Sequence, residues 1–358
     1  MARGNKVDWY LVFTVLSLLI FGVLMVYNAS SANALRDFGD KYYFLKEQVK
    51  WALIGTFAMI FFAFFDYRQL YKFSPFILVV ALIALISVFI PGLGVKAYGA
   101  HRWIDLRFTV LQPSEFSKLV LIIYLSAWFS AKEKGRLLAF GLLLFIFVGL
   151  ILLEPDMGTA IVLGAVGVIL YFLSEAPFYH FLALLPAAAL GAIFLAINSS
   201  YRQKRLTSFL DPSSDPLGAS YHIRQALIAL GSGGLFGLGL GGSRQKYSYL
   251  PEATTDSIFA IIGEELGFIG SLVLISAFIF IFIRGFKIAL AVKEPFGRLL
   301  AAGIISWFSV QTLVNLGAMV SLIPLTGVPL PFISYGGSAL VSEMIGVGIL
   351  LNIRKQNS

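Results

Sequence analysis

Long apolar runs recur along almost the whole chain, and they restrict its fold more than any other feature. A run of about 20 apolar residues is long enough to cross a hydrocarbon core of roughly 30 Å. Lipid offers the backbone no hydrogen-bond partners, so such runs must be helical. Only 13% of the residues are charged, against roughly 25% in an average soluble domain, which argues against a soluble fold.

These runs predict an all-α polytopic membrane protein with about ten transmembrane helices. The runs 114–131 and 336–352 contain the ionisable residues Glu115, Lys118 and Glu343. The first run could be a signal peptide, but it is longer than a typical signal core of 7–15 residues, so we interpret it as a retained span. The predicted cores are 9–27, 49–65, 74–91, 114–131, 137–153, 157–174, 179–197, 262–283, 299–320 and 336–352.

The distribution of Lys and Arg sets the expected orientation. With the N-terminus inside, thirteen of them fall on the inner side and seven in short outer loops. Six more lie in one long outer loop, where positive charge has little influence on orientation. We therefore predict a multi-pass protein of the plasma membrane with both termini in the cytoplasm.

One connection, 198–261, is far longer than the others and is rich in Gly, Ser, Arg and Asp. We treat 1–358 as a single transmembrane domain in which 198–261 is a large extracytoplasmic loop. Two smaller segments, 92–115 and 321–338, lie on the same predicted face. Long loops on a rigid scaffold usually carry function, so we expect the chemistry at this outer face.

Several common kinds of site are excluded by the sequence. The chain has no cysteine, which rules out thiol nucleophiles and cysteine-type metal sites. It has no Walker-type nucleotide loop and no H-E-x-x-H motif, and its glycine run at 231–242 lacks the context of a dinucleotide fingerprint. The basic residues form no stripe interleaved with aromatics, so the net charge of +8 suits anionic lipid better than nucleic acid. No organic cofactor is expected.

The end of the long loop combines two cations with a carboxylate that precedes an apolar run. Arg244 and Lys246 could hold the diphosphate of a lipid-linked substrate. Partial desolvation of Asp256 would raise its pKa toward that of a general base. Aspartate is also a favoured N-cap residue, so helix capping remains an equally good interpretation of Asp256.

Other polar groups also allow two interpretations. Glu115 and Lys118 share a helix face and are either functional or a structural ion pair. Arg102 precedes a tryptophan and could be an interfacial anchor. Glu154 and Asp156 could hold a divalent cation together with substrate phosphates, or could form a plain polar turn.

Five motifs occur in order along the chain, at 102–104 with 111–119, 154–160, 237–239 with 250–256, 263–267 and 329–338. They resemble the motifs of the SEDS family of shape, elongation, division and sporulation proteins, which includes FtsW, RodA and SpoVE. The stretch Gly241–Lys246 looks more like the division and sporulation branches than the elongation branch. In one place the chain departs from the family pattern, with Ser257 where the family usually has Phe.

This resemblance implies a bacterial peptidoglycan glycosyltransferase that polymerises lipid II and works with a cognate class B penicillin-binding protein. It places the catalytic base at Asp256, and it places Arg102, Glu115 and Lys118 near the substrate. A divalent cation, Mg²⁺ or Mn²⁺, is expected to assist. A lipid II flippase without bond chemistry is the main alternative, and a scaffold that recruits a synthase is another.

Overall fold

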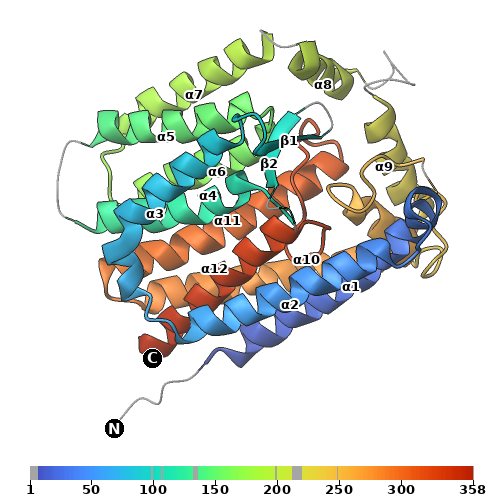
Figure 1. The fold of residues 1–358 in the computed structure, drawn as a ribbon, viewed down its shortest axis with the longest axis horizontal. Coiled ribbons are helices and arrows are strands. Elements are labelled where there is room, and N and C mark those ends of the chain that lie inside the picture. The colour runs from blue at the N-terminus through green and yellow to red at the C-terminus, as the bar shows by residue number, and fades with distance from the viewer. Residues whose placement is uncertain are drawn as a thin grey trace.

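The computed structural model describes residues 7–97, 100–105, 107, 109–131, 136–197, 200–211, 220–247 and 249–357. These residues contain twelve helices and one small sheet (Figure 1). The helices are α1 (Trp9–Phe38), α2 (Tyr43–Phe64), α3 (Arg68–Ser87), α4 (Pro113–Ser130), α5 (Leu137–Leu153), α6 (Met157–Leu173), α7 (Tyr179–Ile197), α8 (Ser200–Leu210), α9 (Tyr221–Ser232), α10 (Ile258–Ala291), α11 (Pro295–Met319) and α12 (Gly337–Gln356). The strands are β1 (Gly94–Ala97), β2 (Ala100–Asp105) and β3 (Val110–Leu111).

All ten predicted apolar segments are helices, which confirms the fold class. Six of them, α1, α2, α3, α10, α11 and α12, are long and apolar enough to cross a membrane. The helices α5, α6 and α7 contain shorter apolar stretches, and α4 is the segment that carries Glu115 and Lys118.

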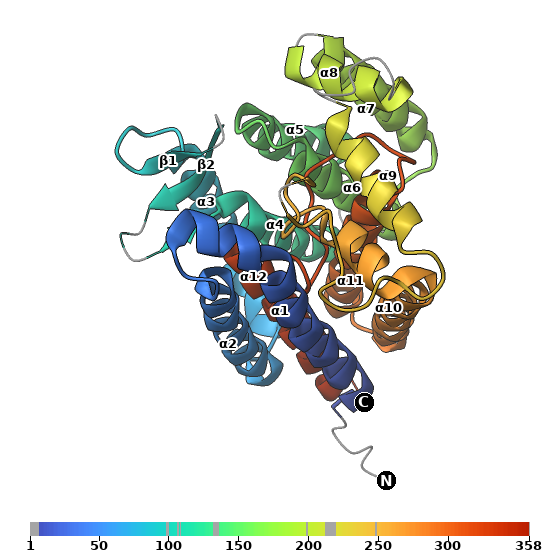
Figure 2. The same cartoon turned by 90° about the vertical axis from the view of Figure 1, so that its right-hand side faces the viewer.

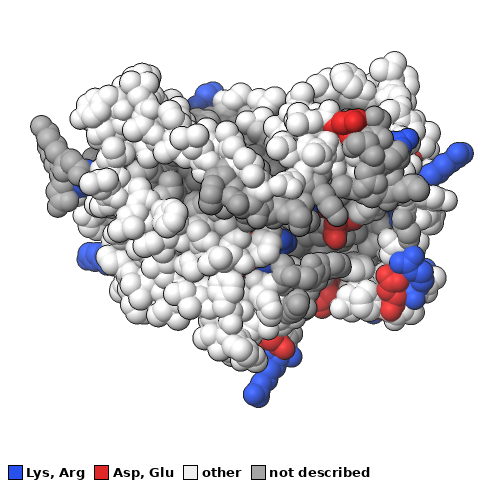
Figure 3. Space-filling model, turned by 90° about the horizontal axis from the view of Figure 1, so that it is seen from above, with Lys and Arg blue, Asp and Glu red and all other residues white. Residues whose placement is uncertain are grey.

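The centre of the bundle is formed by α11 and α12. In the most apolar windows of these helices, 72% and 83% of the residues are buried, against 17% for α2. The helix α12 packs against α2, α4 and α11, and α1 packs against α2 and α10 (Figure 2). Peripheral helices expose large apolar side chains such as Phe13 and Phe57. On the face shown in Figure 3, most of the described surface belongs to residues other than Lys, Arg, Asp and Glu.

Two parts of the fold differ from the predicted plan. Within the predicted segment 92–115, the strands β1, β2 and β3 form a small antiparallel sheet in the order β1-β2-β3, in which Val95 lies opposite Trp103. The long connection is partly helical, because it contains α8 and α9. In Figure 1, α9 lies at the opposite end of the bundle from the start of α1 and the end of α12.

The helix α10 is interrupted at Gly267, whose φ is 67° and ψ is −166°. Backbone groups around this kink are paired with the glycine-rich segment that follows α9. The N–H of Leu238 donates to the Glu264 carbonyl (3.0 Å), and the N–H of Phe268 donates to the Gly234 carbonyl (2.9 Å). The glycine run is therefore a structural segment that satisfies the backbone of a broken helix, as apolar surroundings demand.

Substitution of Gly233 by alanine is expected to destabilise the protein by about 1–3 kcal/mol through overpacking. A Cβ at Gly233 would lie 2.0 Å from the carbonyl oxygen of Gly263. Gly231 is the matched control, because a Cβ there would meet no atom within 4 Å. Gly231→Ala, inside α9, should leave stability unchanged or raise it slightly. Thermal unfolding of the purified variants checks this, and equal melting temperatures would contradict it.

Candidate active site

Distant motifs meet on one irregular segment, residues 325–336, between α11 and α12. The Ser334 hydroxyl donates to the Thr255 carbonyl (2.5 Å), and the Tyr335 N–H donates to the Thr254 carbonyl (2.8 Å). Glycines of two helices approach the same segment. A Cβ at Gly22 of α1 would lie 2.6 Å from Cα of Ile333, and one at Gly158 of α6 would lie 2.6 Å from the Thr326 carbonyl oxygen. Segment 325–336 therefore brings α1, α6 and the loop before α10 together.

Asp256 lies on the loop that rests on this segment. Its residue is 7% exposed, and its Oδ1 accepts a hydrogen bond from the Thr255 hydroxyl (3.2 Å). Asn315 of α11 fixes the backbone by donating to the Asp256 carbonyl (2.8 Å). Among the described residues the carboxylate forms no ion pair, and burial raises its pKa to about 6. A buried carboxylate that is half protonated near pH 6 is suited to accepting a proton.

The capping interpretation of Asp256 is wrong. The helix α10 begins at Ile258 and its N-cap is Ser257, so Asp256 lies one residue before the cap. No described backbone N–H of the first turn donates to the Asp256 carboxylate. The free energy needed to bury this carboxylate is therefore not offset by a helix cap.

Ser257 occupies the position where the chain departs from the family pattern. Its hydroxyl is fully buried and lies 2.6 Å from Nε2 of His222 on α9. Burial, assisted by the nearby charge of Arg205, lowers the pKa of His222 to about 4, so the imidazole is neutral at physiological pH. At this position the chain therefore has a buried serine–histidine contact directly after the aspartate.

Arg205 on α8 is a cation that the sequence reasoning missed. Its Nη1 donates to the Leu325 carbonyl (2.7 Å), at the start of segment 325–336. Its positive charge lowers the pKa of both Asp256 and His222. Arg205 therefore lies close to the aspartate in space although 50 residues separate them in the sequence.

Glu115 and Lys118 form a buried ion pair on α4, with 2.8 Å between the ammonium and the carboxylate. Lys118 also donates to Oε1 of Gln311 on α11 (2.9 Å). The Gln311 amide donates to Glu343 on α12 (2.9 Å), and Glu343 accepts the N–H of Phe332 (2.9 Å). The four side chains form one polar network, which supports segment 325–336 from inside the bundle.

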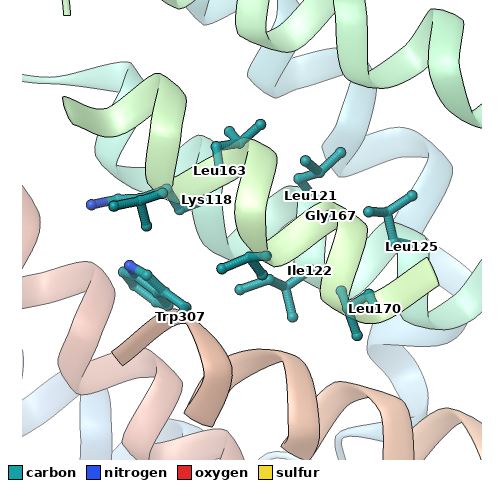
Figure 4. Close-up of a pocket in the computed structure, with 10 residues that line it drawn as sticks. Lys118, Leu121, Ile122, Leu125, Leu163, Gly167, Leu170 and Trp307 are labelled. Atoms are coloured by element: carbon teal, nitrogen blue, oxygen red, sulfur yellow. The ribbon is translucent and has the colours of Figure 1, made fainter. Parts of the chain in front are cut away.

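The space next to Lys118 is small and mostly apolar. Figure 4 shows Lys118 and Trp307 at one side of a cavity otherwise lined by residues such as Leu121, Leu163 and Leu170. Its volume is about 10 Å³, close to the minimum that one water molecule requires. This cavity is too small to accept a sugar or a diphosphate.

Two amides of α11 link this network to the aspartate. The Asn315 amide donates both to the Asp256 carbonyl and to the Val328 carbonyl (2.8 Å each). One turn earlier, the Gln311 amide donates to the Pro329 carbonyl (3.1 Å). The sequence reasoning missed this pair, although two amides four residues apart in an apolar helix are an available signal.

Arg102 on β2 lies at the turn between α5 and α6. Its guanidinium donates to the carbonyls of Glu154 (2.9 Å) and Pro155 (2.5 Å), so it ties the small sheet to this turn. Asp156 caps α6 by accepting the N–H of Thr159 (3.0 Å). The Glu154 carboxyl is fully buried without a described hydrogen-bond partner, and burial raises its pKa to about 9.

This acidic pair does not fit a resident metal site. Asp156 already serves as the cap of α6, and the buried Glu154 carboxyl would have to lose its proton before it could bind a cation. No cluster of three or more candidate ligands occurs among the described residues. The metal role of Glu154 and Asp156 remains a prediction that the geometry does not favour.

Arg244 and Lys246 have different environments in the structure. Lys246 is 5% exposed and is paired with Glu265 (3.1 Å), and it also donates to the carbonyl of Gly241 (2.9 Å) and to Asn28 of α1 (2.8 Å). The Arg244 side chain is exposed, and its guanidinium has no partner among the described residues. Arg244 is therefore available to an anion, whereas Lys246 is already neutralised.

The chain matches the family model described as "Cell cycle protein", for FtsW, RodA and SpoVE, over residues 9–358. It is 44% identical over 357 residues to "Probable peptidoglycan glycosyltransferase FtsW" of Trichlorobacter lovleyi, covering 98% of this chain and 94% of that protein. It is 41% identical over 360 residues to "Stage V sporulation protein E" of Bacillus subtilis, covering 99% of this chain and 98% of that protein.

Solved structures agree with these relatives. A chain from a structure described as "Structural coordination of polymerization and crosslinking by a peptidoglycan synthase complex" superposes with a TM-score of 0.81 at 28% identity, over 98% of each chain. The rod shape determining protein RodA of Thermus thermophilus gives 0.72 at 27% identity, again over 98% of each. The chain therefore belongs to the SEDS family, in its FtsW- and SpoVE-like branch.

Proposed function

We propose that this protein is a peptidoglycan glycosyltransferase that polymerises lipid II into glycan strands at the outer face of the bacterial plasma membrane, with Asp256 as its general base. The names of the FtsW relatives support the activity. The observation that carries the assignment of the base is the buried Asp256 carboxylate. It lies on the loop before α10 that packs on segment 325–336, where the motifs meet, and burial raises its pKa to about 6.

In the proposed reaction, Asp256 takes the proton of a sugar hydroxyl of the acceptor. That oxygen forms a bond to the anomeric carbon of the donor, and the bond from this carbon to the lipid diphosphate breaks. The carboxylate becomes a carboxylic acid, and the diphosphate leaves with the electron pair of the broken bond. A base with a pKa near 6 is ionised at neutral pH and still accepts a proton readily in the transition state.

Two cations are placed to meet the negative charge of the diphosphate. The charge of Arg205 is close enough to lower the pKa of Asp256, and Arg244 is exposed at the end of the glycine-rich segment. Arginine matches phosphate oxygens with planar paired donors. The proposal gives a structural role to the other four candidate residues, Arg102, Glu115, Lys118 and Lys246. They hold the elements that form the site, and a direct contact with substrate remains a prediction for each of them.

The described residues offer no preformed cluster of metal ligands. We therefore propose that a divalent cation binds together with the substrate diphosphate and not at a site made by the protein alone. When bound, it would neutralise phosphate charge. Activity measured after chelation, with Mg²⁺ or Mn²⁺ added back, tests this requirement.

The proposed partner is a class B penicillin-binding protein, and the synthase complex among the structural neighbours supports an assembly of this kind. We also propose that both termini lie in the cytoplasm. The start of α1 and the end of α12 lie at the same end of the bundle, and α9 lies at the other (Figure 1). Cysteine labelling from each side of the membrane tests this orientation, because the native chain has no cysteine.

The pH dependence of polymerisation tests the assignment of the base. The pKa of Asp256 is raised from 3.8 to about 6, so its active, ionised form is lost as the pH falls through 6. We expect kcat/KM to fall about tenfold per pH unit below this value and to level off above it. Initial rates between pH 4.5 and 8 measure the profile. A rate that remains constant down to pH 4.5 would contradict Asp256 as the base.

A lipid II flippase is the second candidate function. The buried network of Glu115, Lys118, Gln311 and Glu343 favours it, because ionisable groups inside a bundle often line transport paths. In this structure, however, the groups of the network are paired with one another. The cavity beside Lys118 would admit about one water molecule, and not a disaccharide.

A further inference from the structure

We propose that His222 is a positioning residue for Asp256 and acts through Ser257. This inference rests on the proposed function, because it assumes that Asp256 is the base. The hydrogen bond between Nε2 of His222 and the Ser257 hydroxyl (2.6 Å) joins α9 to the residue that directly follows the aspartate in the chain.

The behaviour of Ser257 as an N-cap is the first observation behind the proposal. A serine at this position normally accepts an N–H from the first turn of the helix. The Ser257 side chain makes no such bond to α10, and its hydroxyl is directed to His222 instead. Since the hydroxyl is fully buried, His222 is the partner that satisfies it.

The anchoring of His222 is the second observation. His222 lies in the first turn of α9, and α9 packs directly against α10. A Cβ at Gly233, at the end of α9, would lie 2.0 Å from the Gly263 carbonyl oxygen, so the two backbones are in contact. The imidazole is therefore held by a rigid element and not by a free loop.

The loop that carries Asp256 is held on both sides. The Ser334 hydroxyl and the Asn315 amide fix the carbonyls of Thr255 and Asp256 from segment 325–336 and α11. On the C-terminal side of Asp256, the Ser257 hydroxyl contacts His222 of α9. Loss of that contact would allow the Asp256 carboxylate to move relative to the acceptor hydroxyl, and small displacements of a catalytic group lower rates strongly.

The test is a double-mutant cycle on the full-length protein with its penicillin-binding partner, with kcat for lipid II polymerisation as the readout. His222→Ala and Ser257→Ala should each lower kcat about tenfold, with KM unchanged, and the double variant should lose no more than either single one. His222→Gln, whose amide can reach the same hydroxyl, should recover most of the rate. Ser220→Ala is the matched control, since Ser220 is a buried serine beside α9 without a described partner.

Three results would overturn the inference: wild-type kcat for His222→Ala, additive losses in the double variant, or no recovery in a folded His222→Gln. Asp256→Asn, measured alongside, distinguishes a failure of the proposed base from a failure of the proposed positioning role. An inactive Asp256→Asn with a fully active His222→Ala would refute the positioning role alone. A fully active Asp256→Asn would instead refute the proposed base itself.

Discussion

Replacement of Asp256 by asparagine is expected to lower the rate of polymerisation by about 10²–10⁴-fold, the usual contribution of a general base. Asparagine has the same shape but cannot accept the proton. Initial rates of glycan synthesis from lipid II by the purified variant measure the loss. A rate within threefold of the wild type would remove Asp256 from the chemistry.

The same substitution is expected to stabilise the protein. Burial raises the pKa of Asp256 from 3.8 to about 6, so the folded state binds this proton more tightly than the unfolded chain does. Ionisation therefore disfavours folding above pH 6, by on the order of 3 kcal/mol at neutral pH, and has no effect below about pH 3.8. Asp256→Asn should melt at a higher temperature at pH 7. Asp37→Asn, at an exposed site, is the control for which neither activity nor stability should change.

Replacement of Lys246 by methionine is expected to destabilise the protein by about 3–5 kcal/mol, because it leaves the Glu265 carboxylate buried and unpaired. Glu265 is 0% exposed, and water cannot replace the lost ammonium. Thermal unfolding without substrate measures the loss. The double variant Lys246→Met/Glu265→Gln should recover part of it, because no buried charge then remains.

Arg244→Met is the matched control two residues away. The Arg244 guanidinium is exposed without a described partner, so stability should change by less than about 0.5 kcal/mol while KM for lipid II rises. If Lys246→Met instead melted like the wild type and raised KM, Lys246 would be a ligand of the diphosphate and not a structural cation.

The different roles of Arg244 and Lys246 could not be predicted from the sequence. Both are cations in the same short stretch, and nothing local distinguishes them. The difference arises from Glu265, which is held beside the kink at Gly267, and from Asn28 on α1, more than 200 residues away. Pairing across such separations depends on the packed structure, so a local pattern could not predict which of the two cations forms a buried ion pair.

The helices, in contrast, were predictable because hydropathy is a local property. The ten apolar runs became helices, and even the runs with Glu115 and Glu343 did so, because those groups pair inside the bundle. Helices α8 and α9 were missed because neither contains an apolar run long enough to cross a membrane: α8 is mostly polar, and the apolar run of α9 covers only 226–230. Arg205 and His222, which lie on these two helices, were missed for the same reason.

Direct observation of the product from lipid II tests the central claim most directly. The purified full-length protein would be reconstituted in vesicles with its class B penicillin-binding partner, whose transpeptidase is blocked. Glycan strands and released undecaprenyl diphosphate would then be quantified. We expect polymer from the wild type, with release of one lipid diphosphate per bond formed. Lipid II that crosses the bilayer or stays bound while no polymer forms would contradict the proposed activity.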